Sequence, residues 1–61
     1  MKIEIYQKRR VFNSFVVDDS PCAIYENVSN IQIESEYIYG DINGEQLTIK
    51  TDHFNNVYTI R

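Results

Sequence analysis

Hydrophobic and polar residues alternate along much of this chain with a period of two, the period of a β-strand that buries one face. The alternation is clearest in residues 2–6, where Ile3 and Ile5 fall on the same side. No window carries apolar residues at the i, i+3, i+4, i+7 spacing of an amphipathic helix, and a helical turn around 8–14 is the only alternative. Further strands are predicted at four places: 11–17, 22–26, 30–34 and 57–60.

The segment 36–51 holds the strongest local signal, because Asn43-Gly44 separates two runs that are rich in β-branched and aromatic residues. A two-residue type I′ turn needs positive φ at both central positions, and Asn-Gly is the pair that adopts it most readily. The register of the hairpin follows: Ile42 with Glu45, Asp41 with Gln46, Gly40 with Leu47, Tyr39 with Thr48, Ile38 with Ile49 and Tyr37 with Lys50. One face of the hairpin is then aliphatic, and the other carries two tyrosines among polar groups.

The connections between the other segments are less uniform. Residues 18–21, Asp-Asp-Ser-Pro, all favour turns and mark a break in the chain. Residues 7–10 contain no turn former, so either the first strand continues through them, exposed and bent, or they form a wider connection. The run 11–17 is apolar on both faces, which predicts a strand that is central or covered on both sides.

A change of side-chain parity is expected before the hairpin. The inward positions are odd at Ile31 and Ile33 but even at Ile38, so we place a bulge or tight bend near Glu34–Glu36. Gly40 is the expected site of sharp curvature or of a close backbone approach.

Five or six short strands separated by turns predict an all-β chain. We expect one domain over residues 1–61, built as a small antiparallel meander or as an SH3-like or OB-like mini-barrel. A core of this size supplies only about 3–5 kcal/mol of net stability. Cys22 is the only cysteine, so no disulfide within the chain adds to it. Association with a second copy, as a homodimer, or with another protein is the remaining external source of stability, and a monomer that folds alone is the alternative.

Charge is distributed unevenly along the sequence. The net charge is −3, yet residues 1–10 carry four basic residues against one acid, while residues 11–49 carry seven acids and no base. The chain is therefore an acidic body with a basic N-terminal segment. The lone cysteine predicts a reducing compartment, the cytoplasm. No secretory signal is visible, and no apolar segment approaches the roughly 20 residues that a membrane span needs.

Residues able to carry catalysis are few, and their spacing does not bring them together. His53 lies in a loop-like stretch, which predicts an exposed side chain, and Cys22 follows Pro21 in an apolar run, which predicts a small buried one. A catalytic site needs a nucleophile and a base within hydrogen-bond reach of each other. There is no metal-binding CxxC or HxxxH spacing and no phosphate-binding glycine loop. We expect no enzymatic activity, no metal and no cofactor.

Protein–protein interaction is the predicted function, as a small accessory protein, adaptor or inhibitor. The two tyrosines on the polar face of the hairpin are suited to it, because tyrosine supplies a large contact area at low entropic cost. The alternative for these two rings is cross-strand packing, Tyr39 against Thr48 and Tyr37 against the Lys50 stem. The predicted surface consists of Tyr37, Tyr39 and Lys50, with Glu34, Glu36 and Asp41 around them. An edge strand such as 57–60 offers a second route, by pairing with another copy or with a partner.

The alternative is a small β-barrel that binds single-stranded nucleic acid through tyrosines and a basic cluster. Lys8, Arg9 and Arg10 are the candidate contacts, and they would have to lie beside Tyr37 and Tyr39. The acids of the body oppose this function, since affinity for nucleic acid comes mostly from neutralised phosphates. In general character the chain resembles small accessory proteins of phages and other mobile elements, although no motif assigns it to a family.

Overall fold

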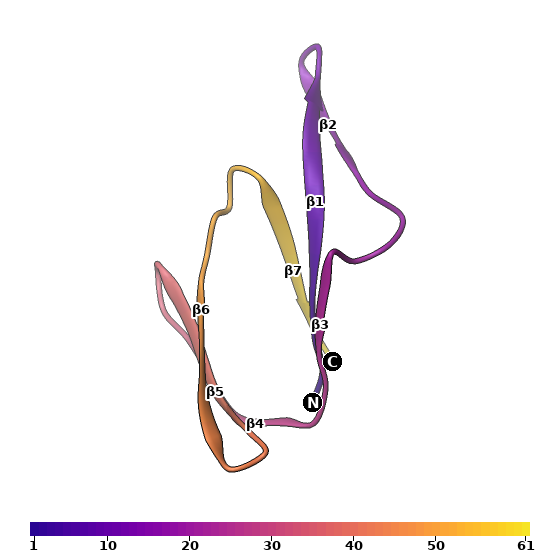
Figure 1. The fold of residues 1–61 in the computed structure, drawn as a ribbon. Coiled ribbons are helices and arrows are strands. Elements are labelled where there is room, and N and C mark those ends of the chain that lie inside the picture. The colour runs from indigo at the N-terminus through magenta and orange to yellow at the C-terminus, as the bar shows by residue number, and fades with distance from the viewer.

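The computed structural model describes all 61 residues and contains seven strands and no helix, which confirms the all-β prediction (Figure 1). The strands are β1 Ile3–Val11, β2 Ser14–Val17, β3 Ala23–Tyr25, β4 Val28–Ile33, β5 Tyr37–Ile42, β6 Glu45–Lys50 and β7 Asn56–Ile60. They form two antiparallel sheets, one built on β1 and the other in the order β4-β5-β6. The protein contains no helix long and apolar enough to cross a membrane.

Strand β1 is the centre of the first sheet and pairs along both of its edges. On one edge its C-terminal half pairs with β2, as in Arg10 opposite Phe15, and its N-terminal half pairs with β3. On the other edge only Ile3–Gln7 pairs, with β7. Residues 7–10 therefore continue the first strand, which was one of the two alternatives, and no helical turn forms around 8–14.

The second sheet is a three-stranded meander whose centre is β5. The hairpin of β5 and β6 follows the predicted register at every position. Asn43 has a φ of 51° and Gly44 a φ of 79°, so both central residues are in the left-handed region that a type I′ turn requires. The Asn-Gly pair thus determines the register of this sheet locally, as the sequence predicts.

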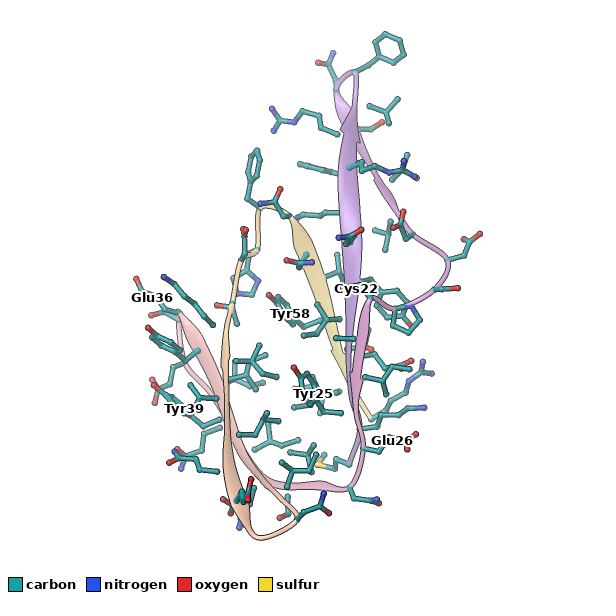
Figure 2. The ribbon with its side chains drawn as sticks, viewed as in Figure 1. Cys22, Tyr25, Glu26, Glu36, Tyr39 and Tyr58 are labelled. Carbon is teal, nitrogen blue, oxygen red and sulfur yellow. The ribbon has the colours of Figure 1, made fainter.

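The two sheets face each other across a small core. Five buried aliphatic side chains form it: Ile3 and Ile5 from β1, and Val28, Ile38 and Ile49 from the second sheet. Tyr25 and Tyr58 pack against this cluster and point into the space between the sheets, as Figure 2 shows. The sheets remain separate hydrogen-bonded units, so the fold is the predicted meander type and not a closed SH3-like or OB-like barrel.

The chain passes from the first sheet to the second at Asn27, which has a φ of 58°. The amino group of Met1 donates to the Val28 carbonyl at 2.8 Å, and the Val28 N–H donates to the Met1 carbonyl at 2.7 Å. These bonds join the two sheets at one end of the molecule. The hairpin of β1 and β2 extends at the opposite end (Figure 1).

The predicted strand 11–17 is wrong in its extent and its setting. A two-residue turn at Phe12 and Asn13 divides it between β1 and β2. Strand β2 is an edge strand, and all four of its residues are exposed, so it is neither central nor covered. The structure has seven strands, where five or six were expected.

The bulge lies inside β4 and not after it. The pairing of β4 with β5 shifts between Ser29 and Gln32, where Asn30 has a φ of 53°. At Glu34–Glu36 the other predicted alternative, a tight bend, is confirmed: the chain turns there into β5, and the Glu34 N–H donates to the Tyr37 carbonyl at 2.8 Å. Ile33 pairs with the buried Ile38 and so lies on the inward face as expected, but it is 68% exposed because nothing covers it at this end of β4. The bulge changes the inward parity of β4 from even at Val28 to odd at Ile33.

Candidate interaction surfaces

The hairpin of β1 and β2 projects beyond the rest of the first sheet (Figure 1). Strand β7 begins at Asn56, opposite Gln7, and the last bond on this edge runs from the Lys8 N–H to the Asn55 carbonyl at 2.9 Å. Past that bond the sheet is a ribbon of two strands. A two-stranded ribbon is at best marginally stable by itself in water. No third strand flanks this ribbon, so its side chains can contact another molecule.

Large apolar side chains are concentrated on this ribbon. Nine large apolar residues of the protein are exposed, and five of them lie here: Val11 43%, Phe12 94%, Phe15 48%, Val16 45% and Val17 43%. An exposed apolar patch with polar residues around it is typical of interaction sites. Natural edge strands are normally protected by charges, proline or a bulge, and β2 has none of these.

Basic side chains flank the apolar ones. Lys8 Nζ lies 4.7 Å from the ring centroid of Phe15, and Arg10 Cζ lies 5.3 Å from the same centroid and 5.6 Å from that of Phe54. These distances permit cation–π attraction, and neither cation forms an ion pair. We name the following residues the hairpin surface: Lys8, Arg9, Arg10, Val11, Phe12, Phe15, Val16, Val17 and Phe54.

Arg9 lies on the other face of the ribbon from Lys8 and Arg10. Its Nη2 donates to Asp18 Oδ1 at 3.3 Å, in an exposed ion pair. A shallow depression of about 290 Å³ lies where β7 leaves β1, lined by Gln7, Lys8, Arg9, Asn55 and Asn56. The depression offers amide and cationic donors and no apolar side chain, so it is suited to an anionic or carbonyl group.

The turn at the end of the ribbon is strained. Phe12 has a φ of 56°, whereas the φ of Asn13 is not positive. This pattern is that of a type II′ turn, in which glycine is preferred at the first central position. A non-glycine residue in such a conformation costs about 1–3 kcal/mol. Since the Phe12 side chain is almost fully exposed, packing within the fold does not account for an aromatic residue at this position.

The tyrosine surface, defined as Tyr37, Tyr39, Lys50, Glu34, Glu36 and Asp41, lies on the second sheet. The rings of Tyr37 and Tyr39 stack, with centroids 5.8 Å apart and planes at 26°. Tyr37 pairs with Lys50 across β5 and β6, as the register predicts. Tyr39 points away from the first sheet (Figure 2). The two rings are half-buried, so cross-strand packing accounts for part of their area.

The acids of the tyrosine surface are placed unevenly. Glu34 and Glu36 are exposed near the turn between β4 and β5. Asp41 Oδ2 accepts a hydrogen bond from Asn30 Nδ2 at 2.8 Å and lines a polar depression of about 190 Å³ that also includes Tyr39. Asp41 therefore helps to hold the bulge of β4, in addition to its place on the predicted surface.

The structure separates the basic cluster from the tyrosines. Lys8–Arg10 belongs to the first sheet, whereas Tyr37 and Tyr39 belong to the second. The rings that lie beside Lys8 and Arg10 are those of Phe15 and Phe54. The nucleic-acid alternative required cations beside tyrosines, and that arrangement does not form.

Cys22 is exposed, which corrects the prediction that it is a small buried side chain. Its N–H donates to the Ile5 carbonyl at 2.7 Å, so the backbone is tied to β1 while the side chain faces solvent. His53 is exposed as predicted, and its ring lies 5.6 Å from that of Tyr58 in an edge-on arrangement. No group of three His, Cys, Asp or Glu side chains is arranged to hold a metal ion.

Asp52 organises the loop before β7. Its Oδ2 accepts from Asn55 Nδ2 at 2.6 Å, and its Oδ1 accepts from the N–H groups of Phe54 and Asn55 at 3.1 and 3.2 Å. The side-chain hydrogen bond from Asn55 is the main reason why the pKa of Asp52 lies below its ordinary value. The loop that carries Phe54 is therefore an ordered turn, which holds this ring beside Arg10.

A polar network lies on the outer face of the first sheet, around Glu4. Its side chain is almost fully buried, and Oε1 accepts a hydrogen bond from Arg61 Nε at 2.7 Å. Oε2 accepts from the Tyr6 hydroxyl at 3.2 Å. The hydrogen bond from Arg61 lowers the pKa of Glu4, and the same bond raises the pKa of Arg61. Because each charge has its partner, this network is structural and offers no free group for chemistry.

The hairpin surface was not predicted from the sequence, because residues 11–17 were expected to form one strand covered on both faces. The signal that could have identified the turn is Asn13-Ser14, two turn-forming residues inside an apolar run. No family model, curated protein or solved structure matches the chain.

Proposed function

We propose that this protein is a non-enzymatic protein–protein interaction module that contacts its partner through the hairpin surface. The observation that carries the proposal is the concentration of exposed apolar side chains on a ribbon that projects from the fold. Burial of such side chains against a partner is favourable by about 25 cal/mol per Å² of apolar surface. In this protein the ribbon gains no such burial from its own core.

The chemistry of the surface favours a partner with an apolar patch edged by carboxylates. Lys8 and Arg10 have no acidic partner within the fold and lie beside the apolar ring of Phe15. Arginine and aromatic residues are enriched among the residues that dominate interface energetics. Charge complementarity would orient the partner and accelerate its association.

The tyrosine surface is a second contact region within the same proposal. Its acids and its half-buried stacked rings differ from the basic, apolar hairpin surface, so the two would select different partners. A protein with both would serve as an adaptor, and one with the hairpin surface alone as an inhibitor or accessory subunit. The free, exposed thiol of Cys22 fits a reducing compartment, which we take to be the cytoplasm.

A capture experiment with matched variants tests the proposal. The full chain serves as bait in extract of its native host, beside Phe12→Ser/Phe15→Ser and Ile33→Ser baits. Ile33 is an exposed apolar residue on the other sheet and is the control. We expect a protein retained by the wild type and by the control but lost from the double variant. Equal retention by all three baits would refute the assignment to the hairpin surface.

Single-stranded nucleic acid remains a second candidate partner, for a specific reason. Phe15 and Phe54 with Lys8 and Arg10 combine aromatic faces and unpaired cations, as single-strand binding sites do. Fluorescence anisotropy with labelled oligonucleotides at low salt separates the candidates. Tight binding that weakens steeply with added salt would favour nucleic acid. The protein-interaction proposal expects no binding, because only three cations serve the surface against an acidic body.

A further inference from the structure

The outer edge of β2 is open for pairing with another strand. Asp18 N–H donates to the Gln7 carbonyl, and Lys8 N–H donates to Asn55 on the opposite side of β1. Bonding direction alternates along an antiparallel ladder, so Gln7, Arg9 and Val11 bond toward β2. Their partners Ser14 and Val16 bond back to β1. Phe15 and Val17 therefore direct their N–H and carbonyl groups away from β1, where no strand of this chain lies.

The side chains of β2 give this edge no protection against association. The strand reads Ser-Phe-Val-Val, contains no charge, proline or glycine, and is exposed throughout. β-Branched and aromatic residues are those that favour strand pairing. Strand β7 also has one unpaired edge, but its residues are half-buried, so β2 is the more accessible of the two.

We propose that the edge of β2 pairs with the same edge of a second copy, in an antiparallel homodimer with its two-fold axis at Val16. In this register Phe15 of each copy lies opposite Val17 of the other. The outward N–H and carbonyl groups of both residues are then all paired. The two hairpins become one continuous ribbon of four strands in the order β1-β2-β2-β1.

The distribution of charged residues around β2 is compatible with a second copy of the chain as the pairing partner. In this register Val16 faces itself, Ser14 faces Asp18 of the other copy, and Asn13 faces Asp19. No two like charges meet across the seam, because β2 is uncharged and the basic residues lie on β1. The β2 strand of a second copy matches this edge in its uncharged, β-branched and aromatic residues, which favour pairing across a seam.

The proposed dimer involves the backbone edge of β2, whereas the proposed function involves the side chains on the faces of the hairpin. The inference therefore goes beyond the proposed function. Lys8, Arg10, Phe15 and Val17 share one face of the hairpin. Dimerisation would place two such faces side by side, so that a partner would meet a doubled basic and apolar surface. The two proposals can be refuted independently, because the oligomeric state tests the dimer and the capture of a partner tests the proposed function.

Sedimentation equilibrium over a wide concentration range tests the dimer. We expect a reversible monomer–dimer equilibrium for the wild type. Val17→Pro removes an outward N–H without touching a β1–β2 bond, and should weaken dimerisation about tenfold or more, since each copy loses one hydrogen bond. Val17→Thr keeps the N–H and a β-branched side chain, and should dimerise like the wild type. A wild type that is monomeric at every concentration, or that forms species larger than a dimer, would overturn the inference.

Cysteine cross-linking tests the register in a Cys22→Ser background, which removes the exposed native thiol. Val16→Cys should form a disulfide-linked dimer under mild oxidation, because residues that face each other at a non-hydrogen-bonded position lie about 4.5 Å apart. Ser14→Cys is the matched control on the same strand. It should not cross-link, because residue 14 of the other copy lies four residues farther along the seam. Equal cross-linking by both variants contradicts the register.

Discussion

Gly40 on β5 lies directly against Val28 on β4, so closely that a Cβ atom on Gly40 would lie 2.7 Å from Val28 Cγ1. The same Cβ would lie 3.2 Å from the Ser29 carbonyl oxygen at the start of the bulge. The close backbone approach expected at Gly40 is confirmed. Val28 is one of the two fully buried large side chains, so the contact lies within the core.

Gly40→Ala should therefore destabilise the fold. The added methyl group would have to displace a buried side chain and a backbone carbonyl, and overpacking of this kind costs about 1–3 kcal/mol. Urea unfolding followed by circular dichroism would show a lower midpoint. Gly40→Ala/Val28→Ala removes the closest contact and should cost less than the sum of the two single variants. Full additivity would show that Val28 is not the source of the strain.

Phe12→Gly should raise the stability of the fold. Glycine accepts the positive φ at this position without steric cost, and the exposed ring makes no core contact that would be lost. We expect a gain of about 1 kcal/mol in the free energy of unfolding, measured in urea. Phe12→Ala removes the ring but keeps the positive φ, so it should leave the free energy nearly unchanged. Both variants should lose partner binding, and retention by either would assign the contact elsewhere on the hairpin surface.

Acid should unfold the protein partly through Glu4. The pKa of Glu4 in the folded state lies below its ordinary value of 4.5, chiefly because Arg61 hydrogen-bonds the carboxylate. Its contribution to stability is therefore complete above about pH 4.5 and is lost as the pH falls through the lower folded-state pKa. Glu4→Gln should lower stability at neutral pH and flatten its decline in acid.

Urea midpoints measured from neutral pH down to about pH 3 would show this difference in slope. Glu36→Gln changes an exposed carboxyl that forms no ion pair and should keep the wild-type slope. Asp52, whose pKa is also lowered, should leave Glu4→Gln with some residual dependence on pH. A slope for Glu4→Gln that equals that of the wild type would contradict the role of the Arg61 hydrogen bond.

Ile3→Val should destabilise the fold by about 0.5–1.5 kcal/mol, because it removes one methyl group from a fully buried position. This is a large share of the roughly 3–5 kcal/mol expected of so small a core. Ile33→Val makes the same chemical change at a residue that is 68% exposed, and its urea midpoint should stay near that of the wild type. Equal shifts for the two variants would mean that the core is not organised around Ile3.

Local signals in the sequence were sufficient wherever the backbone itself sets the conformation. Asn43-Gly44 determined the turn, the register of β5 and β6, and the face on which Tyr37 and Tyr39 lie. The alternation around Ile3 and Ile5 determined the inward face of β1 in the same way. In both cases the chemistry of neighbouring residues is enough, because a strand has a fixed period and this turn has few solutions.

Only the tertiary structure decided which apolar residues are covered. Val16 and Ile38 are alike in sequence pattern, but Val16 lies on the projecting ribbon, where no second layer covers it, whereas the first sheet covers Ile38. Burial depends on what another segment brings against a face, and the local period carries no information about it. The sequence by itself therefore determined an all-β chain and one tyrosine-bearing hairpin. The packing of the two sheets decided that the apolar residues of the β1–β2 hairpin stay exposed.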